Sequence, residues 1–277
     1  MSPDSPLRIA FIGGGNMASA LIGGLLRAGR APVDLLVLEP LAAQRDKLKA
    51  DFGLQAHAAA GPWLAQAGLV VWAVKPQLFA DAAAPCAHWV AGALQLSVMA
   101  GIRCAGIARA LGRSTADARI VRSMPNTPAL IGRGIAGLYA TPVVTPAERG
   151  LVEQLLAPTG QTLWVDQEVD LDAVTALSGS GPAYVFYVIE AMMAAAAEMG
   201  LSPQQGRRLA LATLDGATEL AARSDEPPSV LRERVTSKGG TTHAALQSLQ
   251  ADGVAAAFVK ALKAAQQRAA EMGNEFG

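Results

Sequence analysis

The chain has 277 residues, which is enough for one large domain or two smaller ones with a substantial hydrophobic core. Its 23 Lys and Arg balance its 23 Asp and Glu, and this neutral charge gives no support for binding to nucleic acid or to an anionic membrane. Cys86 and Cys104 lack metal-like or redox-like spacing and there are three histidines, so we expect two reduced thiols and no metal site.

The N-terminal segment, MSPDSPLR, lacks the basic start and the apolar run of a secretory signal peptide, so we expect a cytoplasmic protein. Beyond it, short apolar runs alternate with amphipathic stretches, which is typical of a parallel sheet with crossover helices. A helix closed by Gly29 is expected over 16–28. The five buried strands that we expect cover residues 7–13, 35–40, 69–74, 94–101 and 118–124.

Beyond residue 170 the sequence shows long Ala- and Leu-rich helical patterns and no convincing strand. The most apolar pattern is interrupted by two glutamates, so we expect a buried helix and not a membrane span. Prolines stand at expected first turns and glycines at expected C-terminal positions: Pro182, Pro203, Pro228, Gly200 and Gly253. The expected helices cover residues 182–199, 203–222, 228–234, 242–250 and 253–272. The sequence therefore predicts an α/β domain over 1–165 and an all-helical domain over 166–277.

A glycine-rich loop, IGGGNMA, lies between the first expected strand and the first expected helix and fits the pattern G-x-G-x-x-A. The first glycine permits a sharp turn, the second lets the backbone approach a pyrophosphate, and the alanine lets the helix pack on the strand. Free N–H groups at the helix start favour bound phosphates. A tight structural turn is the alternative, but the strand–loop–helix context favours a Rossmann-type dinucleotide-binding domain with a doubly wound sheet. The cofactor-binding residues expected here are Gly13, Gly14, Gly15, Asn16, Met17 and Ala18.

A carboxylate, Glu39, ends the second expected strand, 21 residues after Ala18. In dinucleotide-binding domains a carboxylate at this place accepts a hydrogen bond from the ribose 2′-hydroxyl and repels a 2′-phosphate, which favours NAD over NADP. Arg45 follows six residues later and is either a ligand for a 2′-phosphate or a solvated arginine on a helix face. We expect Glu39 to bind the cofactor, and the sequence leaves the choice between NADH and NADPH open.

Ligands of doubly wound sheets bind beyond the carboxyl ends of the strands. Three more of these carboxyl ends are expected at the same edge of the sheet as the glycine-rich loop. They carry the stretches AVKPQ, SVMAG and MPNTP. Each stretch alone is compatible with an ordinary strand exit, but three of them after a dinucleotide fingerprint favour a lined site. The additional cofactor-binding residues that we expect are Ala73, Val74, Lys75, Pro76, Val98, Met99, Ala100 and Asn126.

A second glycine-rich stretch, VTSKGGTT, covers residues 235–242 in the all-helical region. Gly239 and Gly240 expose backbone N–H groups, and Thr241 or Thr242 is expected to cap a helix over 242–250, whose N-terminus is a ready anion site. Because no strand precedes this stretch, a second dinucleotide site is not expected. The alternatives are an ordinary loop between helices and a seat for a smaller anion, to which Ser237 adds a hydroxyl.

Five motifs occur in the order and approximate spacing of the pyrroline-5-carboxylate reductase family, which the chain resembles over nearly its whole length. They are IGGGNMA, AVKPQ, MPNTPA, SGSGPAY and VTSKGGTT. The resemblance implies NADPH- or NADH-dependent reduction of a cyclic imine, 1-pyrroline-5-carboxylate, to L-proline. It also implies a helical domain that forms a homodimer, and dimers that often assemble into a decamer. The long apolar helix after SGSG is accordingly expected in a dimer interface.

The resemblance also implies roles for the second loop. Ser237, Gly239, Gly240, Thr241 and Thr242 would bind the substrate, and the hydroxyl of Thr242 would face the ring nitrogen as the catalytic group. A threonine is a poor acid, but it suffices for a protonated imine, which needs only orientation. This loop would hold the substrate and the first loop the cofactor.

Some positions stay ambiguous or depart from the family pattern. Lys75 and Lys238 are not expected to be catalytic, and Glu168 either lies near the nicotinamide or is a carboxylate at a helix start. Many relatives have Asn before the AVKP strand end, where this chain has Ala60, and Met99 replaces the first alanine of the usual A-A-G. Both departures concern cofactor contacts and remove no catalytic group.

Two other functions fit parts of the sequence. A β-hydroxyacid dehydrogenase would need a lysine on the first long helix of the second domain, but that helix reads AYVFYVIEAMMAAAAE. A non-catalytic dinucleotide-sensing dimer would use the first glycine loop but would have no need for a second anion-binding loop. The reductase is therefore the preferred hypothesis.

Overall fold

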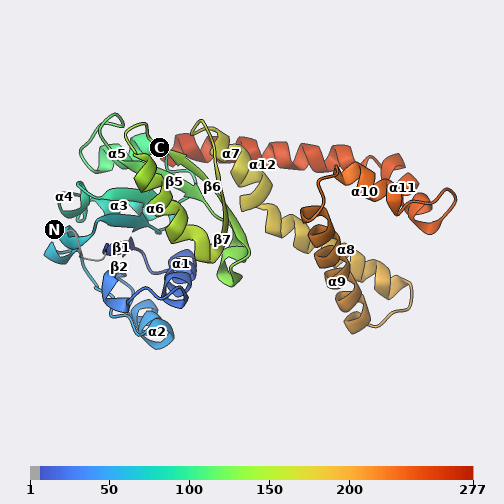
Figure 1. Ribbon diagram of the computed structural model, residues 1–277, viewed down its shortest axis with the longest axis horizontal. Coiled ribbons are helices and arrows are strands. Elements are labelled where there is room, and N and C mark those ends of the chain that lie inside the picture. The colour runs from blue at the N-terminus through green and yellow to red at the C-terminus, as the bar shows by residue number, and fades with distance from the viewer. Residues whose placement is uncertain (1–6, 277) are drawn as a thin grey trace. The chain divides into compact units, whose positions relative to one another are not determined.

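A seven-stranded sheet forms the centre of the first of two structural units in the computed structural model, which describes residues 7–276 (Figure 1). The strand order is β2-β1-β3-β4-β5-β6-β7. Strands β1 to β5 are parallel, β6 is antiparallel to β5, and β7 is parallel to β6. The strands are β1 (Ile9–Ile12), β2 (Leu35–Leu38), β3 (Leu69–Trp72), β4 (Leu94–Ser97), β5 (Ile120–Met124), β6 (Gly134–Ala140) and β7 (Gly160–Trp164). The five expected parallel strands are confirmed, whereas β6 and β7 were not predicted.

Helices cover both faces of this sheet, as a doubly wound sheet requires. Alternate residues of β1 enter separate cores: Ile9 and Phe11 pack with residues of α1, α2 and α6, whereas Ala10 and Ile12 pack with residues of α3, α4 and α5. The helices of this unit are α1 (Asn16–Arg27), α2 (Ala42–Phe52), α3 (Phe79–Ala83), α4 (Ala87–Val90), α5 (Cys104–Ala110), α6 (Pro146–Leu156) and α7 (Asp170–Val174). The expected α/β fold class is confirmed.

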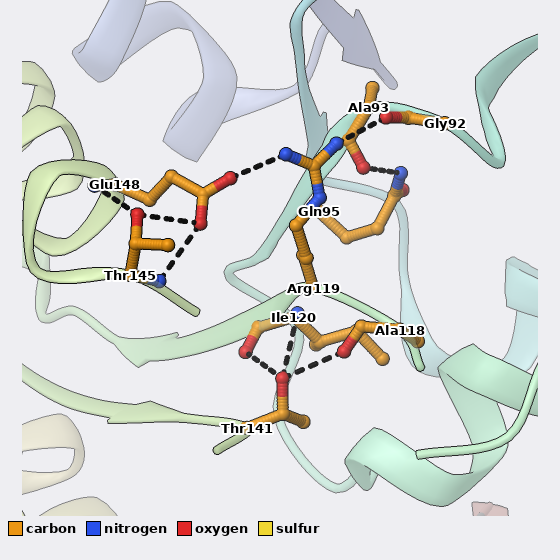
Figure 2. Close-up of polar contacts among 9 residues, drawn as sticks. All are labelled: Gly92, Ala93, Gln95, Ala118, Arg119, Ile120, Thr141, Thr145 and Glu148. Atoms are coloured by element: carbon orange, nitrogen blue, oxygen red, sulfur yellow. Dashed lines mark hydrogen bonds and ion pairs between the residues drawn. The ribbon is translucent and has the colours of Figure 1, made fainter. Parts of the chain in front are cut away.

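Side-chain hydrogen bonds attach the antiparallel strand β6 to β5 (Figure 2). The hydroxyl of Thr141 accepts a bond from the N–H of Ile120 at 3.1 Å and donates to the carbonyl of Ala118 at 2.7 Å. The threonine is 2% exposed, so these bonds satisfy a polar group that is removed from water. They therefore fix where β6 meets the edge of the parallel strands.

A capping box starts α6, the helix that follows β6 (Figure 2). The Thr145 hydroxyl accepts from the N–H of Glu148, and the Glu148 carboxylate accepts from the N–H of Thr145 at 2.9 Å. Arg119 donates to the same carboxylate at 2.6 Å and also to the carbonyl of Gly92. Burial alone would raise the pKa of Glu148, but the bonds from Thr145 and the Arg119 charge lower it below its usual value.

The second unit, Gly181–Ala264, is helical. Its helices are α8 (Gly181–Glu198), α9 (Pro203–Ala222), α10 (Pro228–Arg234), α11 (Thr241–Ala251) and the first part of α12 (Val254–Phe276). Pro203 and Pro228 stand in first turns, and Gly200 and Gly253 adopt positive φ angles of 86° and 65° after α8 and α11. The expected bounds of α9 and α10 agree with the structure residue for residue.

Helix α8 leaves large apolar side chains exposed in the single chain. Phe186 and Tyr187 are 59% and 73% exposed, and Ala196 is the residue of this helix that is buried. Exposed apolar patches of this kind mark interaction surfaces. None of the helices in residues 7–276 combines the length and the apolar character that crossing a membrane needs.

The two compact units differ from the expected domains at 1–165 and 166–277. The first unit extends through Ser180 and also includes residues from Ala265 onward. Ion pairs explain part of the difference, because residues after 165 pair with residues of the sheet unit: Arg103 with Asp172 at 2.8 Å, and Arg122 with Glu168 at 2.9 Å. Residues 1–6, for which the sequence predicts no signal peptide, lie outside the described residues.

Candidate active site

The first glycine loop lies where the carboxyl ends of β1, β2 and β3 meet. The N–H of Gly13 donates to the carbonyl of Leu38 at 2.9 Å, and the N–H of Ala73 donates to Ile12 at 2.9 Å. Gly13 has a φ of +97°, and a Cβ there would lie 2.7 Å from the carbonyl oxygen of Ala73. Glycine is therefore required, and the loop sits at the point in the strand order where ligands of doubly wound sheets bind.

The start of α1 offers unpaired backbone donors. Gly15 precedes the helix in an extended conformation, and no side chain caps the first turn, which contains Asn16, Met17 and Ala18. A Cβ on Gly15 would meet no atom within 4 Å, so its backbone faces open space. Ala18 is fully buried in the core between helix and sheet, as expected. This cradle of amides at a helix N-terminus fits the pyrophosphate of a dinucleotide.

Glu39 lies beneath the glycine loop and is 7% exposed. One carboxylate oxygen accepts from the N–H of Gly14 at 2.9 Å, and the other accepts from the N–H of Leu41 at 2.9 Å. The sequence predicts that this carboxylate accepts a hydrogen bond from the 2′-hydroxyl of a bound ribose. In the structure both of its oxygens bind backbone amides of the protein.

A cavity of about 430 Å³ opens beside the loop. Its lining is mostly apolar and comes from the ends of β1, β2 and β3, from residues 58–60 and from α3 with its flanks. Ala60 lies in this lining, so its methyl group faces the cavity beside the loop. Two residues of the sequence-predicted site, Gly13 and Val74, belong to this lining, and Leu38 and Pro40 were not predicted.

The predicted cofactor-binding residues at the other strand ends differ in how exposed they are. Lys75 is exposed after β3, while Ala73, Pro76, Val98 and Ala100 are half-buried. Met99 is 3% exposed and its side chain belongs to the core beneath α3, α4 and α5. A cofactor contact from Met99 therefore has to come from its backbone and not from its side chain.

Asn126 follows β5 and joins three segments of the first unit. Its side-chain nitrogen donates to the carbonyl of Ser178 at 3.2 Å, and its side-chain oxygen accepts from the N–H of Ile135 at 3.0 Å. The amide thus braces the loop after β5 against β6 and the SGSG stretch. The sequence predicted a polar group presented to the cofactor, and the bracing contacts were not foreseen.

Glu168 connects β5 to the start of α5 in the first unit. One of its carboxylate oxygens accepts from Arg122 at 2.9 Å and from the N–H of Cys104, the first residue of α5, at 2.6 Å. Burial raises the pKa of the Cys104 thiol, and the Glu168 charge raises it further, so this thiol stays protonated. The sequence suggested that Glu168 either lies near the nicotinamide or starts a helix, and neither role includes this bond to α5.

The second glycine loop connects α10 and α11. Gly239 has a φ of +76°, and the N–H of Gly240 donates to the carbonyl of Ser237 at 3.0 Å. Helix α11 begins at Thr241, one residue earlier than expected. The prediction that Thr241 or Thr242 caps it is wrong, because Gly240 occupies the cap position and no side chain bonds to the first turn.

The missing side-chain cap leaves the first-turn amides of α11 without acceptors, which is the arrangement that binds a small anion. A Cβ on Gly240 would lie 2.8 Å from the Ser237 hydroxyl, so this hydroxyl sits directly beside the amides. Thr242 is half-buried and Lys238 is exposed. Among residues 7–276 no group of three or more His, Cys, Asp and Glu side chains is arranged to hold a metal ion.

Comparison with known proteins gives the family. Residues 168–272 match the family described as pyrroline-5-carboxylate reductase dimerisation, and residues 8–101 match the family described as NADP oxidoreductase, coenzyme F420-dependent. A pyrroline-5-carboxylate reductase of Pseudomonas aeruginosa is 44% identical over 273 residues, which cover 98% of this chain and 98% of that protein. The chain belongs to the pyrroline-5-carboxylate reductase family.

Solved structures of this family share the architecture. A pyrroline-5-carboxylate reductase from Coxiella burnetii superposes with a TM-score of 0.89 at 34% identity, covering 97% of this chain and 99% of that chain. A Plasmodium falciparum pyrroline carboxylate reductase with NADP bound superposes with a TM-score of 0.84 at 28% identity, covering 96% and 98% of the two chains. The predicted family and fold class are thus confirmed.

Two features of the structure have no clear signal in the sequence. The segment Thr175–Gly179 forms a π-helical turn before α8. A Cβ on Gly179 would lie 2.5 Å from the Cε of Met124, so the absence of a side chain here makes room for that methionine. The ion pair between Arg122 and Glu168 had no signal in the sequence. An arginine inside an apolar strand needs an acidic partner, but its sequence position does not indicate which acidic residue the fold brings near.

Proposed function

We propose that the protein reduces 1-pyrroline-5-carboxylate to L-proline with NADPH or NADH, the last step of proline biosynthesis. Membership of the pyrroline-5-carboxylate reductase family supports this activity. The observation that carries the proposal is the second loop, an uncapped helix start with two glycines and a hydroxyl, in addition to a dinucleotide cradle. A protein that only binds a dinucleotide has no use for it.

The first loop holds the cofactor, which supplies a hydride to the C=N carbon of the substrate. The amides at the start of α1 bind the pyrophosphate, and the helix dipole stabilises its charge. The strand-end residues line the remainder of the site with short side chains and backbone groups. The residues proposed to bind the cofactor are Gly13, Gly14, Gly15, Asn16, Met17, Ala18, Ala73, Val74, Lys75, Pro76, Val98, Met99, Ala100 and Asn126, with Met99 acting through its backbone.

The second loop holds the substrate carboxylate. The first-turn amides of α11, at Thr241 and Thr242, donate to it, and the hydroxyl of Ser237 adds a further donor. Gly239 and Gly240 keep side chains out of the way. The hydroxyl of Thr242 accepts the N–H of the protonated ring nitrogen, which orients the C=N carbon toward the hydride donor. No strong acid is needed, because the proton is already on the nitrogen.

We also propose that the active form is a homodimer built on the apolar face of α8, and that dimers assemble into a decamer in the cytoplasm. The match of residues 168–272 to a dimerisation family and the exposure of Phe186 and Tyr187 support the dimer. Light scattering at micromolar concentration tests it, and a monomer would contradict it.

The catalytic proposal is tested by mixing the protein with 1-pyrroline-5-carboxylate and either NADPH or NADH and following the absorbance of the reduced nicotinamide. Consumption of one or both is expected, and no consumption with either would overturn the proposal. Thr242→Ala should lower kcat about 10- to 100-fold, the value of a hydrogen bond to a charged group. Cofactor binding should stay nearly unchanged.

Two companion variants sharpen this test. Thr242→Ser keeps the hydroxyl and should recover much of the turnover. Thr218→Ala removes an exposed hydroxyl from α9 that bonds only within its own helix, and it should behave as the wild type. If Thr242→Ala weakened cofactor binding as much as turnover, the role assigned to Thr242 would be wrong.

A further inference from the structure

The end of β2 carries a carboxylate that is turned inward. Both oxygens of Glu39 are engaged, one with the N–H of Gly14 and the other with the N–H of Leu41, each at 2.9 Å. A Cβ on Gly14 would lie 3.4 Å from the Cβ and Cγ of Glu39, so the side chain runs directly under the loop. A ribose 2′-hydroxyl would have to compete with two backbone amides for this buried group.

Arg45 contacts the same strand end. It lies in the first turns of α2, and its Nη1 donates to the carbonyls of Glu39 at 3.0 Å and Pro40 at 2.7 Å. Pro40 also lines the cavity of about 430 Å³. These two bonds hold the guanidinium at the carboxyl end of β2, beside the cavity.

Two nitrogens of the Arg45 guanidinium group remain available as hydrogen-bond donors. Within residues 7–276, Arg45 makes no ion pair, and its Nε and Nη2 make no hydrogen bond. Its neighbour Gln44 is neutral and donates to the carbonyl of Gly14, which adds a second tie between α2 and the glycine loop. Asp81 is the acidic member of the cavity lining, on the α3 side.

We infer that Arg45 selects NADPH by binding its 2′-phosphate, and that Glu39 is a positioning residue for the glycine loop and not a ligand of the ribose. The inference rests on the proposed function in that it concerns the cofactor of that reaction. A guanidinium with free, coplanar donors matches a phosphate dianion. The carboxylate that would repel this phosphate has its charge compensated by two amides and lies below the loop.

The inference is tested by equilibrium binding without substrate, using the fluorescence of the reduced nicotinamide. Arg45→Gln should weaken NADPH binding about 10- to 100-fold, the value of a charge-assisted hydrogen bond, while NADH binding changes less than about two-fold. Competition by 2′,5′-ADP should weaken in parallel and competition by 5′-AMP should not. Arg113→Gln, at an exposed arginine far along the chain in the α5–β5 connection, is the matched control and should change neither.

Glu39→Gln tests the second half of the inference. An amide cannot accept from both backbone N–H groups through its nitrogen, so binding of NADPH and NADH should weaken by the same factor and the melting temperature should fall. If NADH binding fell while NADPH binding rose, Glu39 would be a ribose ligand and the inference would be overturned. Equal losses of both cofactors in Arg45→Gln would also overturn it.

These measurements separate the inference from the proposed function. Selective loss of NADPH binding in Arg45→Gln supports the inference even if the wild type failed to reduce 1-pyrroline-5-carboxylate. Conversely, an active reductase whose Arg45→Gln variant kept its NADPH affinity would retain the proposed function and lose the inference. Because Arg45 is half-buried at the surface of α2, this variant is expected to fold even if Glu39→Gln does not.

Discussion

The two glycine-rich loops are built in different ways, although both present backbone amides at a helix start. The first loop is shaped by residues distant in sequence. Gly13 lies against the carbonyl of Ala73, and the N–H of Gly14 bonds to Glu39, 25 residues later.

The second loop is shaped by its own residues. Gly240 bonds to the carbonyl of Ser237 and lies against its hydroxyl, and a Cβ on Gly239 would meet no atom within 4 Å. Turn chemistry and the start of α11 are enough to produce it. The difference teaches that two loops with similar glycine-rich sequences can differ in support: distant residues shape the first, whereas a local turn is enough for the second.

The largest expected effect comes from a side chain at Gly13. Gly13→Ala places a Cβ 2.7 Å from a backbone oxygen at a φ of +97°, so we expect a loss of more than about 2 kcal/mol of stability. NADPH binding should be lost as well. Urea unfolding and cofactor titration measure both. Gly15→Ala is the control, since open space surrounds that position, and it should remain stable. A stable, binding-competent Gly13→Ala would refute the tertiary shaping of the first loop.

A smaller effect is expected at Gly239. Gly239→Ala strains the backbone at a φ of +76° but meets no neighbour, so the cost should be about 1 kcal/mol. Substrate KM should rise with little change in NADPH affinity. Steady-state kinetics at saturating cofactor and a urea titration are the measurements. A loss as large as that of Gly13→Ala would show that the second loop also depends on distant contacts.

The smallest effect concerns the core under the first loop. Cys86 is fully buried in the same core as Ile12, and burial raises its thiol pKa to about 11. The folded protein should therefore resist alkylation at pH 8 and react fully in urea. Because the unfolded thiol ionises near pH 8.5, this contribution to stability should be present below that pH and decline between there and about pH 11. Rapid labelling of the native protein would contradict a closed core.

Local signals predicted much of the chain. Prolines and glycines punctuate the second unit so clearly that α9 and α10 were predicted residue for residue. The first loop is recognisable in the sequence because an apolar strand runs directly into three glycines, and a small residue follows three positions after the last of them. The strands β6 and β7 escaped because their glycines and polar residues weaken the apolar pattern, and because pairing decides whether such segments become strands.

By itself the sequence determined the family, the five parallel strands, the helices of the second unit and the two loops that offer backbone amides, because these depend on motifs and on conformational preferences of neighbouring residues. The tertiary structure alone decided what the polar side chains do. Glu39 binds Gly14, Asn126 binds Ser178 and Glu168 binds Cys104, over separations of 25, 52 and 64 residues. The physical reason is that a buried polar group takes whichever partner the fold brings within about 3 Å, and that partner is chosen by packing and not by neighbours in the chain.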